Sequence, residues 1–214
     1  MTKNALLLLW SAVLFHACTT KPPADYALVI RNALIYDGSG NPPYEGAVAI
    51  SGDTIAALGD IGSKRGQKEI DAEGMAVSPG FINMLSWATE SLLADGRAMS
   101  DLKQGVTLEV MGEGWSMGPL NETMKADMRK SQGDIKFDIE WTTLGEYLQY
   151  LERKGISPNV ASFVGATTVR IHELGYSDRP PNPEELARMQ ELVRQAMREG
   201  ALGVGSSLIY APAF

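Results

Sequence analysis

The chain has 214 residues, of which 44% are hydrophobic, and this length can bury the core of one large domain or of two small ones. Acidic side chains outnumber basic ones by 26 to 19, which gives a formal net charge of -7. Nucleic-acid-binding proteins present a basic surface to the phosphate backbone, so we expect no nucleic-acid partner.

The amino terminus resembles an export signal. Residues 5–15 form an apolar run behind Lys3 that is too short to span a bilayer but is typical of a secretion signal. The only cysteine, Cys18, follows this run with the small Ala17 before it, so residues 1–18 resemble a bacterial lipobox. We therefore expect an exported periplasmic or cell-envelope protein that reaches the membrane only through a lipid on Cys18. The alternative is a plain signal peptide cut nearby.

A polar spacer at residues 19–25 leads into a β-rich region. Short runs rich in β-branched residues, separated by Gly and Asn, predict four strands of a small antiparallel sheet. The turn between the first two strands is expected at Asn32-Ala33. The predicted strands are 26–31, 34–36, 46–50 and 54–58.

From residue 89 onward the pattern changes to strands alternating with helices. Thr143 and Glu146 have the spacing of a reciprocal helix cap, and Pro183 is suited to a helix start. Strands separated by helices pair in parallel, which leaves two architectures open, a doubly wound sheet and a TIM barrel. The predicted helices are 89–104, 121–129, 144–154 and 183–199, and the predicted strands are 106–111, 159–164 and 202–207.

Five blocks in the same order resemble the amidohydrolase superfamily, and within it the N-acyl-D-amino-acid deacylases. They are 25–32, Pro79-Gly80-Phe81-Ile82, Gln104-Gly105-Val106-Thr107, 159–165 and 199–210. The resemblance implies an incomplete TIM (β/α) barrel of about four βα units at 75–214, preceded by part of a small β-sandwich at 26–74. Because the chain ends at Phe214, just past the fourth predicted strand, we expect it to be the N-terminal portion of a longer protein.

In that family the strand containing Pro79-Gly80-Phe81-Ile82 leads into a His-x-His pair that binds metal. Here Leu85 and Trp87 occupy those two places, and neither side chain can ligate a metal. Glu113 follows the second predicted barrel strand, where the deacylases carry a metal-binding cysteine, so the resemblance implies Glu113 as a ligand of a divalent metal, with zinc expected. The alternative for Glu113 is a solvated loop carboxylate.

Three further residues are candidates at the mouth of the barrel. His172 and Arg170 are expected in the loop after the third strand, where Arg170 could bind a substrate carboxylate through its guanidinium fork. Tyr210 lies in a Leu-Ile-Tyr-x-Pro segment that, by resemblance, helps to hold the substrate carboxylate. Each has a plainer alternative as a packing or surface residue.

The resemblance implies a hydrolase of carbon–nitrogen bonds other than peptide bonds. The expected reaction is deacylation of a small-molecule N-acyl amino acid, or a related amide, by a metal-bound hydroxide. The loss of histidines at 85 and 87 supports a different hypothesis, a metal-free, non-catalytic binding protein descended from such an enzyme.

Overall fold

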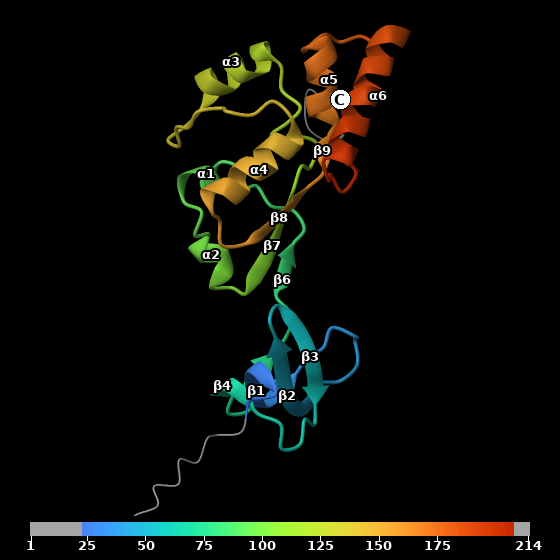
Figure 1. The fold of residues 1–214 in the computed structure, drawn as a ribbon. Helices are drawn as coiled ribbons and strands as arrows, with labels where there is room; N and C mark the ends of the chain where they lie inside the picture. Colours follow the sequence, from blue (N-terminus) through green and yellow to red (C-terminus); the bar gives the residue numbers. More distant parts are fainter. Residues whose placement is uncertain (1–22, 208–214) are drawn as a thin grey trace, which may run out of the picture. The chain divides into compact units, whose positions relative to one another are not determined.

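The computed structural model describes residues 23–207, and the chain divides into two compact units at Pro79 and Gly80 (Figure 1). The boundary lies five residues beyond the one predicted at 74 and 75, because β5 (Ala76–Val77) pairs with the first strand of the sheet unit. Among the described residues, no helix is long and apolar enough to cross a membrane. The export segment with Cys18 and the segment with Tyr210 lie outside the described residues.

The first unit is a sheet of five strands in the order β3-β2-β1-β4, with β5 also paired to β1. The strands β1, β2 and β3 are antiparallel neighbours, but β4 and β5 run parallel to β1, so the predicted all-antiparallel sheet is wrong. The sequence concealed β4 because Gly-Gln-Lys-Glu-Ile-Asp has no apolar alternation, and most of it is exposed. The bounds are β1 (Tyr26–Ile35), β2 (Tyr44–Ser51), β3 (Thr54–Gly59) and β4 (Gly66–Asp71).

The turn predicted at Asn32-Ala33 is not formed, because β1 continues as one strand through these two residues. Asn32 has a φ of 51°, and the register against β2 shifts between Ile30 and Ala33, as at a β-bulge. The Asn32 side-chain amide donates to the Asp71 carboxylate at 3.0 Å. Asparagine tolerates the left-handed backbone region, so Asn32 marks a kink within one strand and not a turn between two strands.

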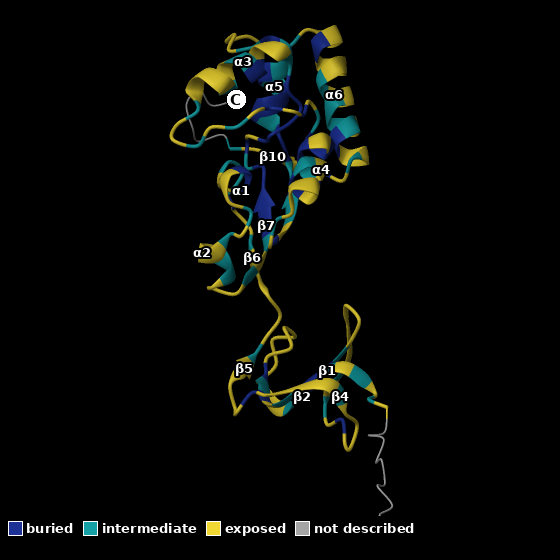
Figure 2. Ribbon diagram, turned by 60° about the vertical axis from the view of Figure 1, so that its left-hand side comes forward, coloured by how far each residue is buried: buried dark blue, intermediate teal, exposed yellow. Residues whose placement is uncertain are grey.

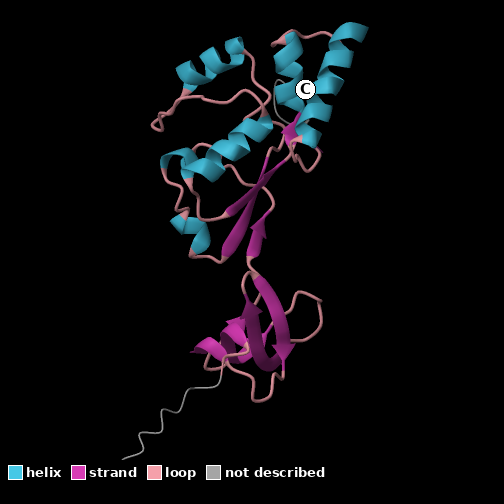
Figure 3. Ribbon diagram, viewed as in Figure 1, coloured by secondary structure: helices cyan, strands magenta, loops and turns pink. Residues whose placement is uncertain are grey.

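The second unit contains parallel strands, as the helical spacing predicts (Figure 3). The first sheet has the order β6-β7-β8, formed by β6 (Phe81–Asn83), β7 (Val106–Met111) and β8 (Asn159–Ser162). After an interruption at Phe163 the chain continues as β9 (Val164–Gly165), which pairs in parallel with β10 (Val204–Gly205). The carboxyl ends of successive strands therefore lie along one edge.

Three of the predicted helices form close to the expected positions. They are α3 (Glu122–Ser131), α4 (Leu144–Lys154) and α6 (Pro183–Arg198). The reciprocal cap at Thr143 and Glu146 is confirmed, and α6 begins with a second such cap, formed by Asn182 and Glu185.

The single helix predicted at 89–104 is wrong. The chain forms two short helices, α1 (Ser91–Ala94) and α2 (Met99–Leu102). Between them the Asp95 carboxylate accepts the backbone N–H of Arg97 at 3.0 Å, a local bond that competes with the helix. At Gly96 a Cβ would lie 2.8 Å from the carbonyl oxygen of Gly155, so this break packs closely against the end of α4.

The loop predicted to carry Arg170 and His172 is a helix, α5 (Ala166–Leu174). The β-branched run Thr167-Thr168-Val169 has little helix propensity, which hid it from the sequence pattern. Burial overrides that preference, because Thr168 is fully buried and Val169 is only 2% exposed.

The main core of the second unit is formed by residues of α4, the strands and the neighbouring helices, and Figure 2 marks the buried segments in dark blue. Trp141, Tyr147 and Leu151 are almost completely buried. The Trp141 indole N–H donates to the Met117 carbonyl at 2.6 Å, so the same core holds the loop after β7.

Candidate active site at the strand ends

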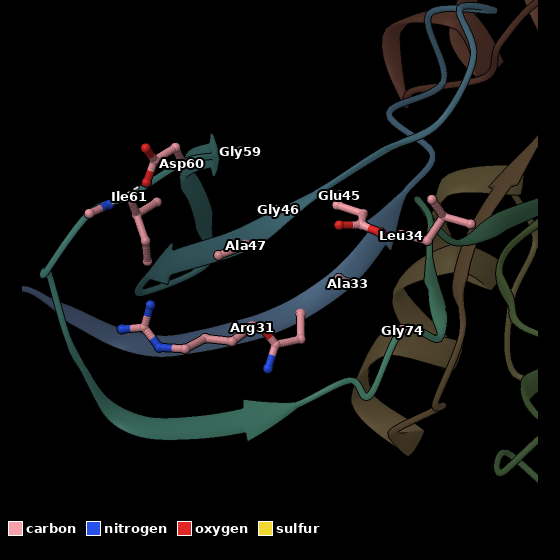
Figure 4. A pocket seen from close by; sticks show the side chains of 12 residues that line it. Arg31, Ala33, Leu34, Glu45, Gly46, Ala47, Gly59, Asp60, Ile61 and Gly74 are labelled. Atoms are coloured by element: carbon pink, nitrogen blue, oxygen red, sulfur yellow. Dashed lines mark hydrogen bonds between the residues drawn. The ribbon is translucent and has the colours of Figure 1, made fainter.

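The sheet unit contains a cavity of about 520 Å³ (Figure 4). Arg31 is its cationic lining residue, and Glu45 and Asp60 are its acids. The Arg31 guanidinium donates to the Glu69 carboxylate at 3.0 Å and to the Lys64 carbonyl at 2.6 Å. The hydrogen bond from Arg31 lowers the pKa of the Glu69 carboxyl to about 2. Arg31 is therefore engaged in holding the edge of the sheet.

A second cavity, of about 450 Å³, lies at the carboxyl ends of β6 and β7. We call it the Glu113 cavity. It is lined by residues 86 and 87, which follow β6, and by residues 112, 113 and 115–117, which follow β7. This is the edge at which parallel α/β folds place their chemistry. The remaining lining residues are Thr89, Glu90, Ser91, Met128 and Ile135.

Leu85 and Trp87, at the places where the resembling family carries its histidine pair, are 53% and 60% exposed at the end of β6. Ser86 between them is buried, and its backbone N–H donates to the Val110 carbonyl at 2.8 Å. The backbone of this segment is thus fixed beside β7, while the side chains at 85 and 87 offer no metal ligand. Within residues 23–207 no group of three or more His, Cys, Asp and Glu side chains could hold a metal ion.

Glu113 lies directly after β7 in the loop Gly112-Glu113-Gly114. One of its carboxylate oxygens, Oε2, is buried and has no hydrogen-bond partner among the described residues. The Ser207 hydroxyl is likewise buried without a hydrogen-bond partner among the described residues. It lies beside Gly114, because a Cβ added to Gly114 would be 3.1 Å from the Ser207 hydroxyl oxygen. Buried polar atoms without partners are uncommon and mark places where a ligand or ion can be bound. Glu113 thus fits the role of one metal ligand, but the described residues do not complete a centre.

The strand ends are held by backbone packing that only glycine permits. At Gly112, where φ is 94°, a Cβ would lie 2.1 Å from the Phe163 carbonyl oxygen. At Gly165 a Cβ would lie 2.2 Å from the Gly114 carbonyl oxygen, and at Gly205 it would lie 2.1 Å from that of Gly112. The three strand ends therefore approach one another through bare backbone, which fixes the position of Glu113.

Ser116 joins the Glu113 loop to the start of α5. Its hydroxyl accepts the Gly165 N–H at 2.9 Å, and its own N–H donates to the Thr168 hydroxyl at 2.8 Å. The Thr167 N–H donates to the Gly114 carbonyl at 3.0 Å. Two N–H groups at the beginning of α5 are satisfied in this way by the loop.

His172 lies in the last turn of α5 and lines a third cavity, of about 470 Å³, that includes residues of α3 and α5. We call it the His172 cavity. Its Nδ1 lies 3.0 Å from a Glu173 carboxylate oxygen, and Arg188 donates to the other oxygen. Burial opposes the charge of Glu173, but the hydrogen bonds from Arg188 and His172 outweigh it and lower the pKa of this carboxyl below its usual range. His172 and Glu113 line different cavities.

Arg170 lines neither cavity. Its guanidinium donates to the carbonyl oxygens of Ser177 and Arg179 at 3.0 and 2.8 Å, so it holds the segment after α5. A substrate-binding role for Arg170 stays a prediction.

Sequence reasoning missed a buried carboxylate on β7. Glu109 is fully buried, and one of its oxygens accepts the Asn83 side-chain amide at 3.1 Å. Its other oxygen, Oε1, has no hydrogen-bond partner among the described residues. The available signal was a charged residue in the middle of the strand Val-Thr-Leu-Glu-Val-Met, because carboxylates are rarely buried without a specific partner.

No family model matches the chain. It is 32% identical over 192 residues to an N-acyl-D-aspartate deacylase of Alcaligenes xylosoxydans xylosoxydans, across 89% of the chain and 38% of that relative.

Two similar solved structures belong to proteins with related names. A D-aminoacylase, described as having a binuclear metal centre, matches with a TM-score of 0.75 and 29% identity over 88% of the chain and 40% of its own. An N-acyl-D-glutamate deacylase of Bordetella bronchiseptica, complexed with zinc and a phosphonate inhibitor, matches with a TM-score of 0.73 and 24% identity over the same shares, which supports the fold alone. The chain thus spans about two fifths of the length of these proteins.

Proposed function

Since the chain is related in sequence and fold to the N-acyl-D-amino-acid deacylases of the amidohydrolase superfamily, we propose that its parent protein hydrolyses carbon–nitrogen bonds other than peptide bonds. The proposed substrate is a small N-acyl amino acid. The observation that carries the proposal is the unpartnered Glu113 carboxylate oxygen at the end of β7, in a cavity at the edge where this fold places its chemistry. In this proposal the two units are an N-terminal part of a β-sandwich and about four βα units of a TIM barrel.

Glu113 is proposed to hold a divalent metal, with zinc as the first candidate, together with ligands outside residues 23–207. A bound metal of this kind polarises the scissile carbonyl and acidifies water. The chain's own contribution is to position Glu113 through the packed glycines and through Ser116, and to present Trp115 and Met117 as an apolar wall of the Glu113 cavity. Leu85 and Trp87 take no part in holding the metal.

The test is to measure metal content and amine release in the purified full-length parent protein and in its Glu113→Gln variant. The proposal expects that the wild type binds zinc and deacylates at least one N-acetyl-D-amino acid, and that the variant loses most of both. Glu140→Gln removes an exposed carboxylate that does not line the cavity and serves as the matched control. Unchanged metal content and activity in Glu113→Gln would overturn the role of Glu113.

A second candidate function is favoured by Leu85 and Trp87, which leave the end of β6 without ligands. It is a non-catalytic binding protein that retains the fold. That function predicts binding of N-acyl amino acids with no metal and no amine release, so the same two measurements separate the candidates.

Cys18 and Tyr210 lie outside the residues that the structure describes. We propose that Cys18 carries the lipid that anchors the exported protein at the cell envelope, and that Tyr210 contributes to the substrate carboxylate site. Cys18→Ala should move the protein from the membrane fraction to the soluble fraction, and Tyr210→Phe should raise the KM for the N-acyl amino acid more than it lowers kcat. A variant at Cys18 that stays in the membrane fraction, or unchanged kinetics at Tyr210, would contradict the respective role.

A further inference from the structure

The Glu113 cavity and the His172 cavity are neighbours. They share Glu90, Trp115, Ser116 and Met128 as lining residues, so a molecule bound at Glu113 can extend toward His172 past the Trp115 indole. The volume of the His172 cavity, about 470 Å³, is sufficient for an amino-acid side chain or an acyl group.

The His172 cavity is lined by acids and by no lysine or arginine of the described residues. Within residues 23–207, no lysine or arginine lines either cavity, whereas Glu90 and Asp127 contribute carboxylates that the proposed metal does not occupy. Glu173, the remaining acid of the His172 cavity, already has Arg188 and His172 as partners. Asp127 lies 4.0 Å from Lys130, at the limit of an ion pair and exposed to solvent, so little of its charge is compensated.

Besides neutral polar and aliphatic residues, the lining of the His172 cavity includes two aromatic and two thioether side chains. Trp115 is 44% exposed and Tyr176 is 62% exposed, and Met124 and Met128 come from α3. Exposed aromatic faces attract cations, and methionine side chains adapt to alkyl chains. The combination of acids with aromatic and thioether groups matches an alkyl chain that ends in an amine.

We infer that the His172 cavity is the specificity site of the proposed hydrolase and selects substrates with a cationic amine on an alkyl side chain. The inference rests on the proposed function and deepens it. Asp127 and Glu90 attract the ammonium group, Trp115 and Tyr176 contact it through their ring faces, and the two methionines contact the methylene groups. An acidic substrate side chain, such as the aspartate in the name of the N-acyl-D-aspartate deacylase, would be repelled by the carboxylates of the cavity.

The experiment measures binding rather than turnover, with one pair of probes that differs only in the terminal ammonium and a third, shorter probe that ends in a carboxylate. Nα-acetyl-D-lysine, Nα-acetyl-D-norleucine and Nα-acetyl-D-glutamate are titrated by calorimetry into the purified full-length parent protein. We expect the lysine derivative to bind about tenfold more tightly than the norleucine derivative, because its ammonium gains one cation–π contact and the attraction of a partly screened carboxylate. The glutamate derivative should bind most weakly.

Asp127→Asn is the decisive variant, because it removes charge and keeps shape. It should weaken the lysine derivative by several-fold and leave the norleucine derivative unchanged. Asp138→Asn changes an exposed acid that lines neither cavity and should alter neither probe. Equal binding of the lysine and norleucine derivatives, or equal loss of both in Asp127→Asn, would overturn this inference alone. If none of the three probes binds, the proposed function falls together with it.

Discussion

The hydroxyl oxygen of Ser116 accepts the backbone N–H of Gly165 at 2.9 Å, which connects the loop that carries Glu113 to the first turn of α5. Both residues are buried, so no water can take over this bond if it is lost.

Ser116→Ala should therefore lower the free energy of unfolding by about 1–3 kcal/mol, since it leaves the Gly165 N–H buried without a partner. Denaturant unfolding measures this difference. Ser63→Ala, at an exposed position of the sheet unit, should change it by less than about 0.5 kcal/mol. A loss in Ser116→Ala no larger than that of the control would show that the bond contributes nothing to stability.

The close packing at Gly112 can be separated from its backbone conformation by comparison with Gly200. Both have a positive φ, 94° and 103°, but a Cβ at Gly200 meets nothing within 4 Å. Gly200→Ala should cost about 1 kcal/mol from strain alone, whereas Gly112→Ala adds overpacking and should cost about 3 kcal/mol or more. Equal losses in the two variants, measured by denaturant unfolding, would contradict the close approach of Gly112 to Phe163.

Asn83 is suited to Glu109 because its amide donates to the buried carboxylate. Asn83→Asp would place two carboxylates together, so we expect a loss of about 2 kcal/mol or more at pH 7. One carboxyl of such a pair has a raised pKa in the folded state, so the folded variant binds an extra proton and the loss should shrink on acidification to pH 5. The control is Asn159→Asp, which removes an amide that donates to the Thr107 carbonyl at an exposed site. It should lower the free energy of unfolding by less than Asn83→Asp does. A loss in Asn83→Asp that does not depend on pH would contradict the pairing.

Glu185 lies in the first turn of α6, and its carboxylate accepts a hydrogen bond from the Arg179 guanidinium at 2.7 Å. The Arg179 hydrogen bond, helped by the Asn182 N–H, lowers the pKa of Glu185 to about 2, from 4.5 for the unperturbed group. A lowered folded-state pKa gives stability that is present above the unfolded pKa and is lost as pH falls toward the folded one. The difference in free energy of unfolding between wild type and Glu185→Gln should therefore be largest above about pH 5 and fall between pH 4.5 and pH 2.

The control for that pH series is Glu184→Gln, which changes the exposed carboxylate one residue earlier. Urea unfolding at several pH values provides the measurement. A difference between wild type and Glu185→Gln that stays constant across this pH range would show that the Arg179 pair does not stabilise the fold.

The sequence by itself determined the elements whose signals are local. The cap at Thr143 and Glu146, the proline at the start of α6 and the parallel strands between helices follow from spacing and side-chain chemistry, which neighbouring residues settle among themselves. The sequence alone also shows that Leu85 and Trp87 occupy the places of the histidine pair found in the resembling family.

Tertiary packing decided the rest. β4 has no apolar pattern and forms because β1 offers it hydrogen bonds, and α5 forms against its propensity because Thr168 and Val169 are buried. The partners of Glu109 and the two cavities joined at Trp115 depend on residues far apart in the chain, which no local pattern encodes. Local preferences amount to tenths of a kcal/mol per residue, whereas burial and buried polar contacts contribute several times more, so the tertiary structure prevails wherever the two disagree.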